Sequence, residues 1–209
     1  MATLTFMTHV QLLLIDGFDP MDVVGPFEVL SAAAFLNPGA LQVEFAAATG
    51  PGEVRSAFGN FRLAATTALD PAADLIIIPG VLGEDLDSVT DKVAVTAKEL
   101  GPLLAPVMAD PETLVAIVCG GSMLLAVAGL ITGRHAVTHG MGTEALAAAG
   151  VNVVRARVVD DGDLITAGGV TSGIDLGIHL VERILGPGAA LAVEEILEFE
   201  RRGTVWRAA

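Results

Sequence analysis

The sequence predicts one α/β domain in which helices cover both faces of a mostly parallel, doubly wound sheet. Apolar runs of strand length recur along the 209 residues, and most of them precede a stretch with helical character. No linker, internal repeat or low-complexity segment interrupts the chain, and its length suffices for one core. We therefore expect residues 1–209 to form a single domain.

The first half of the chain alternates strands with helices. The run at 10–15, VQLLLI, is continuously apolar, as in a strand buried on both faces. Asp19 and Pro20 predict a helix start, with aspartate as the N-cap, and we expect Pro26 to disturb this helix after its first turns. The other elements expected here are a strand at 42–49, a hairpin or pair of edge strands around Gly59-Asn60, a strand at 74–80, an acidic helix and an amphipathic stretch at 91–104.

The second half continues the alternation. Its expected elements are a strand at 115–118, a helix at 121–128, strands at 135–139 and within 151–168, and helices at 172–185 and 188–201. A hairpin turn is expected at Asp161-Gly162. Strands that alternate with helices pair in parallel through right-handed crossovers, which gives the doubly wound arrangement.

Composition excludes several classes of partner. The net charge is −14 and no basic run occurs, so binding to nucleic acid or to an anionic membrane is not expected. Residues 115–133 carry no charge and are long enough to span a bilayer, but four glycines and a change from strand-like to helix-like character favour a buried strand, turn and helix. The start lacks a basic segment and a cleavage site, and one cysteine forms no intrachain disulfide, so we expect a cytoplasmic protein.

The single cysteine, Cys119, lies where a predicted strand turns into a helix. Ligands of doubly wound sheets bind beyond the carboxyl ends of the strands, and three such ends stand out, at 15–22, 78–83 and 118–121. The helix N-terminus would favour the thiolate and lower the pKa of Cys119. Gly120 and Gly121 would permit a sharp turn and leave space for a small ligand. The alternative interpretation is a small side chain in the core.

Asp22 and the histidines are the candidate partners of this thiol. Asp22 is three residues after Asp19, so it is either an acid in the first helical turn or a proton donor. His135 and His139 have the spacing of zinc ligands on a helix, but the β-prone residues between them would separate the rings by roughly 13 Å, so no metal site is expected. No glycine loop matches a nucleotide-binding motif, and no cofactor is expected; Thr171 or Ser172 would cap the helix that follows.

Four stretches together resemble the DJ-1/PfpI superfamily. They are LLLIDGFDPMDVVGPFEVL, DLIIIPGVLG, AIVCGGSMLLAVAGLITGRHAVTHG and ITAGGVTSGIDLGIHLVERILG. The resemblance extends over about residues 10–201 and is greatest to the isonitrile (isocyanide) hydratase branch, which is also similar to the N-terminal domains of some AraC-type regulators. It implies a flavodoxin-like sandwich with helices on both faces of the sheet.

The resemblance also implies roles for individual residues. Cys119 would be a nucleophile-elbow cysteine and Asp22 its carboxyl partner, where many superfamily members have glutamate and the hydratase branch has aspartate. The amides of Gly80 and Gly120 would stabilise developing negative charge. The substrate pocket would include Val81, Gly121, His139, Val170 and Thr171.

The chain departs from its relatives at two positions. Protease-like and glyoxalase-like members usually have histidine directly after the cysteine, whereas this chain has Gly120, which counts against both activities. The hydratase branch commonly reads Cys-Thr-Gly, and this chain reads Cys-Gly-Gly. His139 stands in THG where relatives often have THW, which indicates a changed pocket.

The activity implied is hydration of a small isonitrile to an N-substituted formamide in a tight, apolar pocket that favours compact, uncharged substituents. Cys119 would add to the isonitrile carbon while Asp22 delivers a proton. A redox- or ligand-sensing module and a glyoxalase-like 2-oxoaldehyde enzyme remain alternatives. Superfamily members are usually dimeric, and a mean hydropathy of +0.66 is consistent with a homodimer.

Overall fold

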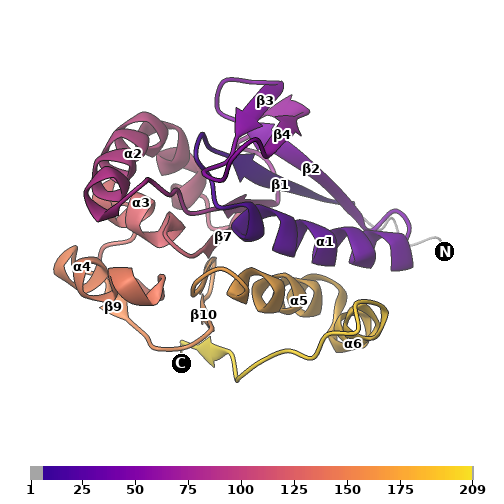
Figure 1. The fold of residues 1–209 in the computed structure, drawn as a ribbon. Coiled ribbons are helices and arrows are strands. Elements are labelled where there is room, and N and C mark those ends of the chain that lie inside the picture. Colours follow the sequence, from indigo (N-terminus) through magenta and orange to yellow (C-terminus); the bar gives the residue numbers. More distant parts are fainter. Residues whose placement is uncertain (1–6, 209) are drawn as a thin grey trace.

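The computed structural model of the protein describes residues 7–208 and has an eight-stranded central sheet (Figure 1). Its strands lie in the order β12-β10-β11-β7-β6-β1-β2-β5, and within the described chain every neighbouring pair is parallel except β10 and β11. These strands are β1 (Thr8–Leu14), β2 (Leu41–Ala47), β5 (Thr67–Ala68), β6 (Leu75–Ile78), β7 (Leu114–Val118), β10 (Val158–Asp161), β11 (Leu164–Ala167) and β12 (Trp206–Arg207).

Two small pairs of strands lie outside this sheet. An antiparallel hairpin joins β3 (Gly52–Arg55) to β4 (Arg62–Ala65), and β8 (His135–Ala136) pairs in parallel with β9 (Asn152–Val153). The helices are α1 (Pro20–Leu36), α2 (Leu86–Ala109), α3 (Gly121–Val127), α4 (Thr143–Ala148), α5 (Ser172–Leu185) and α6 (Pro187–Ile196), with a 3-10 turn η1 (Gly140–Gly142) before α4.

The central strands are covered on both faces because their side chains alternate between two apolar cores. In β1, Leu12 and Leu14 pack with residues of α1, α5 and α6, whereas Leu13 packs with residues of α2, α3 and α4. The same alternation separates Ile77 from Ile76 in β6. Continuous apolar runs such as VQLLLI therefore encode strands buried on both sides. The predicted α/β class with a mostly parallel, doubly wound sheet is confirmed.

Helix α1 differs from the prediction at Pro26. Asp19 caps this helix by accepting from the backbone N–H of Met21 at 3.0 Å, as expected, but the helix continues through Pro26 to Leu36. Pro26 is buried, and a Cβ placed on Gly173 of α5 would lie 3.1 Å from its Cδ. Close packing of α1 on α5 thus offsets the backbone hydrogen bond that proline cannot make.

Several boundaries also differ from the prediction. The acidic and amphipathic segments after the 74–80 strand form one helix, α2, whose N-terminus is fixed by a capping box between Asp85 and Ser88. The strand expected at 135–139 ends at Ala136, and the last helix ends at Ile196 rather than Arg201. Edge strand β12 was not predicted, because two residues carry no periodic signal. No helix in the part of the chain that the structure describes is long and apolar enough to cross a membrane.

The turn from β7 into α3 imposes different requirements on its two glycines. A Cβ on Gly121 would lie 2.7 Å from Ile117 Cγ2 and within 2.9 Å of the carbonyl oxygens of Ile78 and Pro79. A Cβ on Gly120 would meet nothing closer than Gly80 Cα at 3.6 Å, and Gly120 has an ordinary helical φ of −67°. The expectation that both glycines leave space for a ligand is therefore wrong for Gly121. The space where its side chain would stand is filled by Ile117 of β7 and by the carbonyl groups at the end of β6.

We predict that Gly121→Ala lowers the free energy of unfolding by about 1–3 kcal/mol, the usual cost of overpacking a core. Gly120→Ala is the matched control and should change that free energy by less than about 1 kcal/mol. Denaturant unfolding of both variants measures the difference. Equal destabilisation by the two alanines would contradict the packing described here.

Candidate functional site

Three adjacent strand ends converge at the candidate site. Asp22 follows β1 on the first turn of α1, Gly80 follows β6, and Cys119 follows β7; these strands are neighbours in the order β1-β6-β7. A Cβ on Gly80 would lie 2.8 Å from the backbone nitrogen of Gly120 and 3.0 Å from Asp22 Oδ2. The structure thus brings together the three residues that the sequence placed at strand ends.

Cys119 occupies a sharp turn that its surroundings hold in place. Its φ is +56°, a left-handed conformation that non-glycine residues adopt rarely and at an energetic cost. The backbone N–H of Cys119 is shared between the carbonyl oxygens of Ala167 and Gly168, at 3.0 and 3.2 Å. Its own carbonyl oxygen accepts from the Thr138 hydroxyl at 2.9 Å. Segments that follow β8 and β11 therefore stabilise the strained turn.

Asp22 is fully buried, so it is not a solvated charge at a helix terminus. Its Oδ2 accepts from the backbone N–H of Gly80 at 3.0 Å. Its Oδ1 is also buried, and no group of the described chain meets it in hydrogen-bond geometry. A buried carboxylate oxygen without a partner is costly, which favours the neutral acid.

Burial, together with the negative charge of Asp19, raises the pKa of Asp22 to about 8. The Gly80 N–H and the nearby Cys119 thiol act in the opposite direction because they favour the ionised carboxyl. Asp22 is therefore largely protonated at neutral pH.

The expected low pKa of Cys119 is wrong. Burial raises the pKa of the thiol to about 12, and the Asp22 carboxylate adds to this effect, although the amides of Val170 and Gly120 favour the thiolate. The side chain of Cys119 is buried, and the helix after it has only seven residues, so its dipole does not overcome desolvation. At neutral pH the adjacent thiol and carboxyl are both uncharged.

The amides near the sulfur also differ from the expected pair. Gly80 donates its N–H to Asp22, so it is not available to stabilise charge on a substrate. The amides that favour a thiolate at Cys119 belong to Gly120, as expected, and to Val170, whose φ of +50° turns the β11–α5 loop toward the site. Val170 was predicted as a pocket residue, but its backbone is what contacts the thiol.

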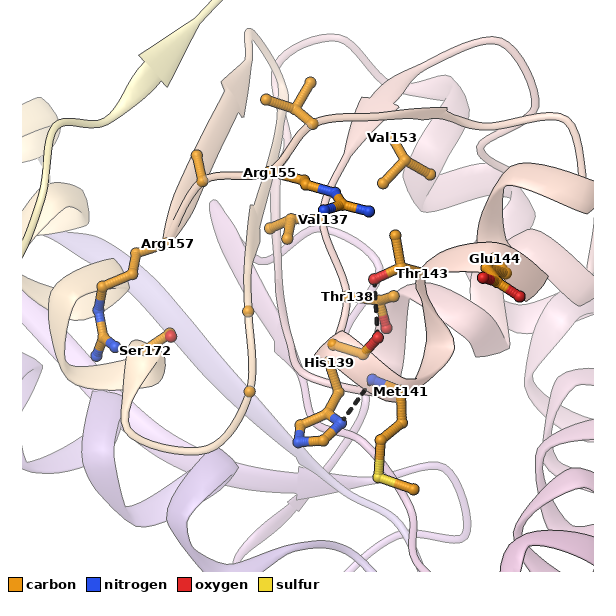
Figure 2. A pocket seen from close by; sticks show the side chains of 15 residues that line it. Val137, Thr138, His139, Met141, Thr143, Glu144, Val153, Arg155, Arg157 and Ser172 are labelled. Atoms are coloured by element: carbon orange, nitrogen blue, oxygen red, sulfur yellow. Dashed lines mark hydrogen bonds between the residues drawn. The ribbon is translucent and has the colours of Figure 1, made fainter.

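Thr138 and Gly168, which hold the backbone of Cys119, also line a cavity of about 880 Å³, and we call it the side cavity (Figure 2). Of the predicted pocket residues, only His139 lines it; its ring packs against Gly169, where a Cβ would lie 2.3 Å from Cδ2. Arg155, Arg157 and Glu144 also line the side cavity. The side cavity is therefore not the tight, apolar pocket expected from the sequence, and that pocket stays a prediction.

The other predicted pocket residues have structural roles. Val81 is buried and its backbone bridges to Phe18, while Gly121 is packed against β6. Thr171 occupies the N-cap position of α5, but its hydroxyl accepts from Arg157 at 3.2 Å instead of capping the helix. None of these side chains lines the side cavity.

Sequence reasoning missed Thr138, Gly168 and Asp19 as members of the site. Thr138 and Gly168 hold the backbone of Cys119, and Asp19 acts on the pKa of Asp22 through its charge. The Gly168-Gly169 pair after a strand was the one available signal for a close backbone approach. In the described part of the chain, no cluster of three His, Cys, Asp or Glu side chains is arranged to hold a metal ion.

The model of the DJ-1/PfpI family matches residues 8–183. The chain belongs to this family. It is 29% identical over 205 residues to an isonitrile hydratase from Pseudomonas putida, an alignment that covers 91% of this chain and 78% of that protein. It is also 29% identical over 178 residues to DJ-1 homolog A from Arabidopsis thaliana, covering 82% of this chain and 43% of that protein.

Solved structures of the same family share the fold. A ThiJ/PfpI family protein from Pseudomonas syringae superposes with a TM-score of 0.79 and 24% identity, covering 97% of this chain and 80% of that protein. Similarity at that level supports the architecture of this DJ-1/PfpI family member, and its chemistry has to be argued from its own residues.

The arrangement predicts how Cys119 titrates. Alkylation of the native thiol by iodoacetamide should accelerate with pH and show a midpoint above the value of about 8.5 for free cysteine. Asp22→Asn should lower this midpoint, because it removes the carboxylate that opposes the thiolate. Asp16→Asn, an exposed acid on the loop after β1, is the control and should leave the midpoint unchanged. A wild-type midpoint below 8.5 would instead indicate a thiol activated by the helix.

Proposed function

We propose that the protein hydrates small isonitriles to N-substituted formamides, with Cys119 as the nucleophile and Asp22 as the proton donor. The observation that supports this most strongly is the buried carboxyl with a pKa of about 8 next to a buried thiol on a strained turn. An isonitrile needs a nucleophile and an acid at the same carbon, and this pair supplies both.

The reaction can be written with this pair as it stands at neutral pH. The sulfur of Cys119 adds to the terminal carbon of R–N≡C as Asp22 delivers its proton to that carbon, and the thiol proton returns to the carboxyl. The product is a thioimidate, R–N=CH–S–Cys119. Water adds to its carbon, the C–S bond breaks, and R–NH–CHO leaves with the thiol restored. The Gly120 and Val170 amides, which favour the thiolate, stabilise the sulfur as it departs.

The alternatives have less support from the geometry. Redox-sensing cysteines are typically exposed and of low pKa, whereas Cys119 is buried and the pKa of its thiol is raised. A glyoxalase-like reaction needs a base near the thiol, and at position 120 there is a glycine in place of the histidine of glyoxalase-like relatives. Hydration of an isonitrile requires no such base.

The pH dependence of turnover tests the role of Asp22. Because the acid form is the active one, kcat/KM for a small isonitrile should be highest below pH 8 and should fall as the pH rises through about 8. Asp22→Asn should lower kcat by about 10²-fold or more, and Cys119→Ala should abolish turnover. Formamide production followed by NMR is the measurement.

Asp16→Asn again serves as the matched control, since Asp16 is exposed and pairs with Arg55 and Lys92 rather than with the site. Near wild-type turnover of Asp22→Asn would remove the proposed acid. Lactate formed from methylglyoxal, with no formamide from any isonitrile, would replace the reaction with a glyoxalase-like one.

We also propose that the protein is a homodimer in a reducing, cytoplasmic environment. Large apolar side chains remain exposed on the described surface, including Phe35 at 75%, Met141 at 70% and Leu191 at 59%. Contiguous apolar surface generally marks an interaction site, and in the proposed dimer the second copy covers such side chains. Sedimentation at micromolar concentration should give twice the monomer mass of 21.3 kDa, and a monomer at that concentration would refute the dimer.

A further inference from the structure

The side cavity has no role in the reaction steps above, although two of the residues that line it contact the backbone of Cys119. Thr138 and Gly168 line it, and both bond to the backbone of Cys119, at 2.9 and 3.2 Å. These two contacts place the side cavity next to the backbone of Cys119. The chemistry of that space depends on the charged groups that line it.

Two arginines line the side cavity, and only one of them is neutralised. Arg157 donates to Asp175 Oδ2 through Nε and a terminal nitrogen, at 2.8 and 2.6 Å, and also to Thr171. Arg155 is exposed and has no hydrogen bond or ion pair within the described residues. Its side chain extends over the side cavity on the side of Thr138 and Thr143 (Figure 2).

The other polar side chains around the side cavity mostly have partners already. Thr138 donates to Cys119 and Thr143 donates to the carbonyl of Gly140. His139 accepts from the Met141 N–H at its Nδ1, so in the neutral ring Nε2 carries the proton and is a donor. The acid at this rim is Glu144, which is exposed on the first turn of α4 and forms no ion pair with Arg155. The donors left without a partner in the described part of the chain therefore include His139 Nε2 and the guanidinium of Arg155, which carries a full positive charge. Together they suit an anion.

We propose that the side cavity binds the carboxylate of a small molecule, with Arg155 as the recognising cation. Arginine is suited to this because its planar fork of donors matches a carboxylate. The proposal rests on the proposed function in one respect: it makes the substrate an isonitrile whose substituent carries a carboxylate, and the product an N-formyl amino acid. Arg155 is then the residue that determines specificity.

Direct binding tests this without turnover. Wild-type protein should bind N-formylglycine more tightly than N-formylglycinamide in calorimetry, and the preference should weaken as salt is added. Arg155→Gln should reduce affinity for the acid about tenfold or more, the cost of losing a charge-assisted hydrogen bond, and should leave affinity for the amide unchanged. Lys98→Gln, which removes an exposed cation from α2, should change neither.

Equal binding of the acid and the amide by the wild type, no binding of either, or an acid affinity that Arg155→Gln leaves unchanged would overturn the proposal. Turnover separates its failure from that of the proposed function. If isonitriles are hydrated, Arg155→Gln should raise the KM for isocyanoacetate and leave the KM for its methyl ester unchanged. If none is hydrated while the binding results hold, the hydration proposal fails and the carboxylate site stands.

Discussion

The contact on which the rest of the site depends is the hydrogen bond from the Gly80 backbone to the buried carboxyl of Asp22. It fixes the side chain of α1 against the end of β6 and leaves the other carboxyl oxygen without a partner. Because that oxygen and its surroundings are buried, the carboxyl remains an acid at neutral pH. The Gly80 amide thus fixes the position of Asp22, whereas burial keeps the carboxyl protonated although that amide favours the ionised form.

This arrangement requires close approach of three chain segments, and the approach explains which glycines are needed. A side chain on Gly80 would collide with both Asp22 and Gly120, and one on Gly121 would collide with the carbonyls that follow β6. A similarly close approach joins α1 to α5, where a Cβ on Gly177 would lie 2.8 Å from Val29. Helix α1, which carries Asp22, is therefore held in place by its packing on α5 as well as by its N-cap.

The sequence was sufficient to place Asp22, Gly80 and Cys119 at one edge of the sheet, because parallel strands bring their carboxyl ends together whatever the loops between them. It could not give the pKa of Cys119, since the direction of that shift depends on how deeply the thiol is buried, and a helix N-terminus alone suggested the opposite. Pro26 was misjudged for a related reason: local propensity predicts a break, but packing on α5 offsets it. Arg155 was missed because an isolated arginine in a loop carries no signal in the sequence. Only the structure shows which residues surround it and that none of those it describes pairs with it.

The two glycines after Cys119 differ in how far the fold constrains them. Gly121 is fixed by the backbone of β6, whereas Gly120 has an ordinary helical conformation and free space where a Cβ would stand. Relatives with histidine or threonine at this position fit the same picture, since the turn itself does not have to change. A different side chain can therefore stand directly after Cys119, within reach of whatever binds at the strand ends, while the strained turn and the buried Asp22 carboxyl keep their positions.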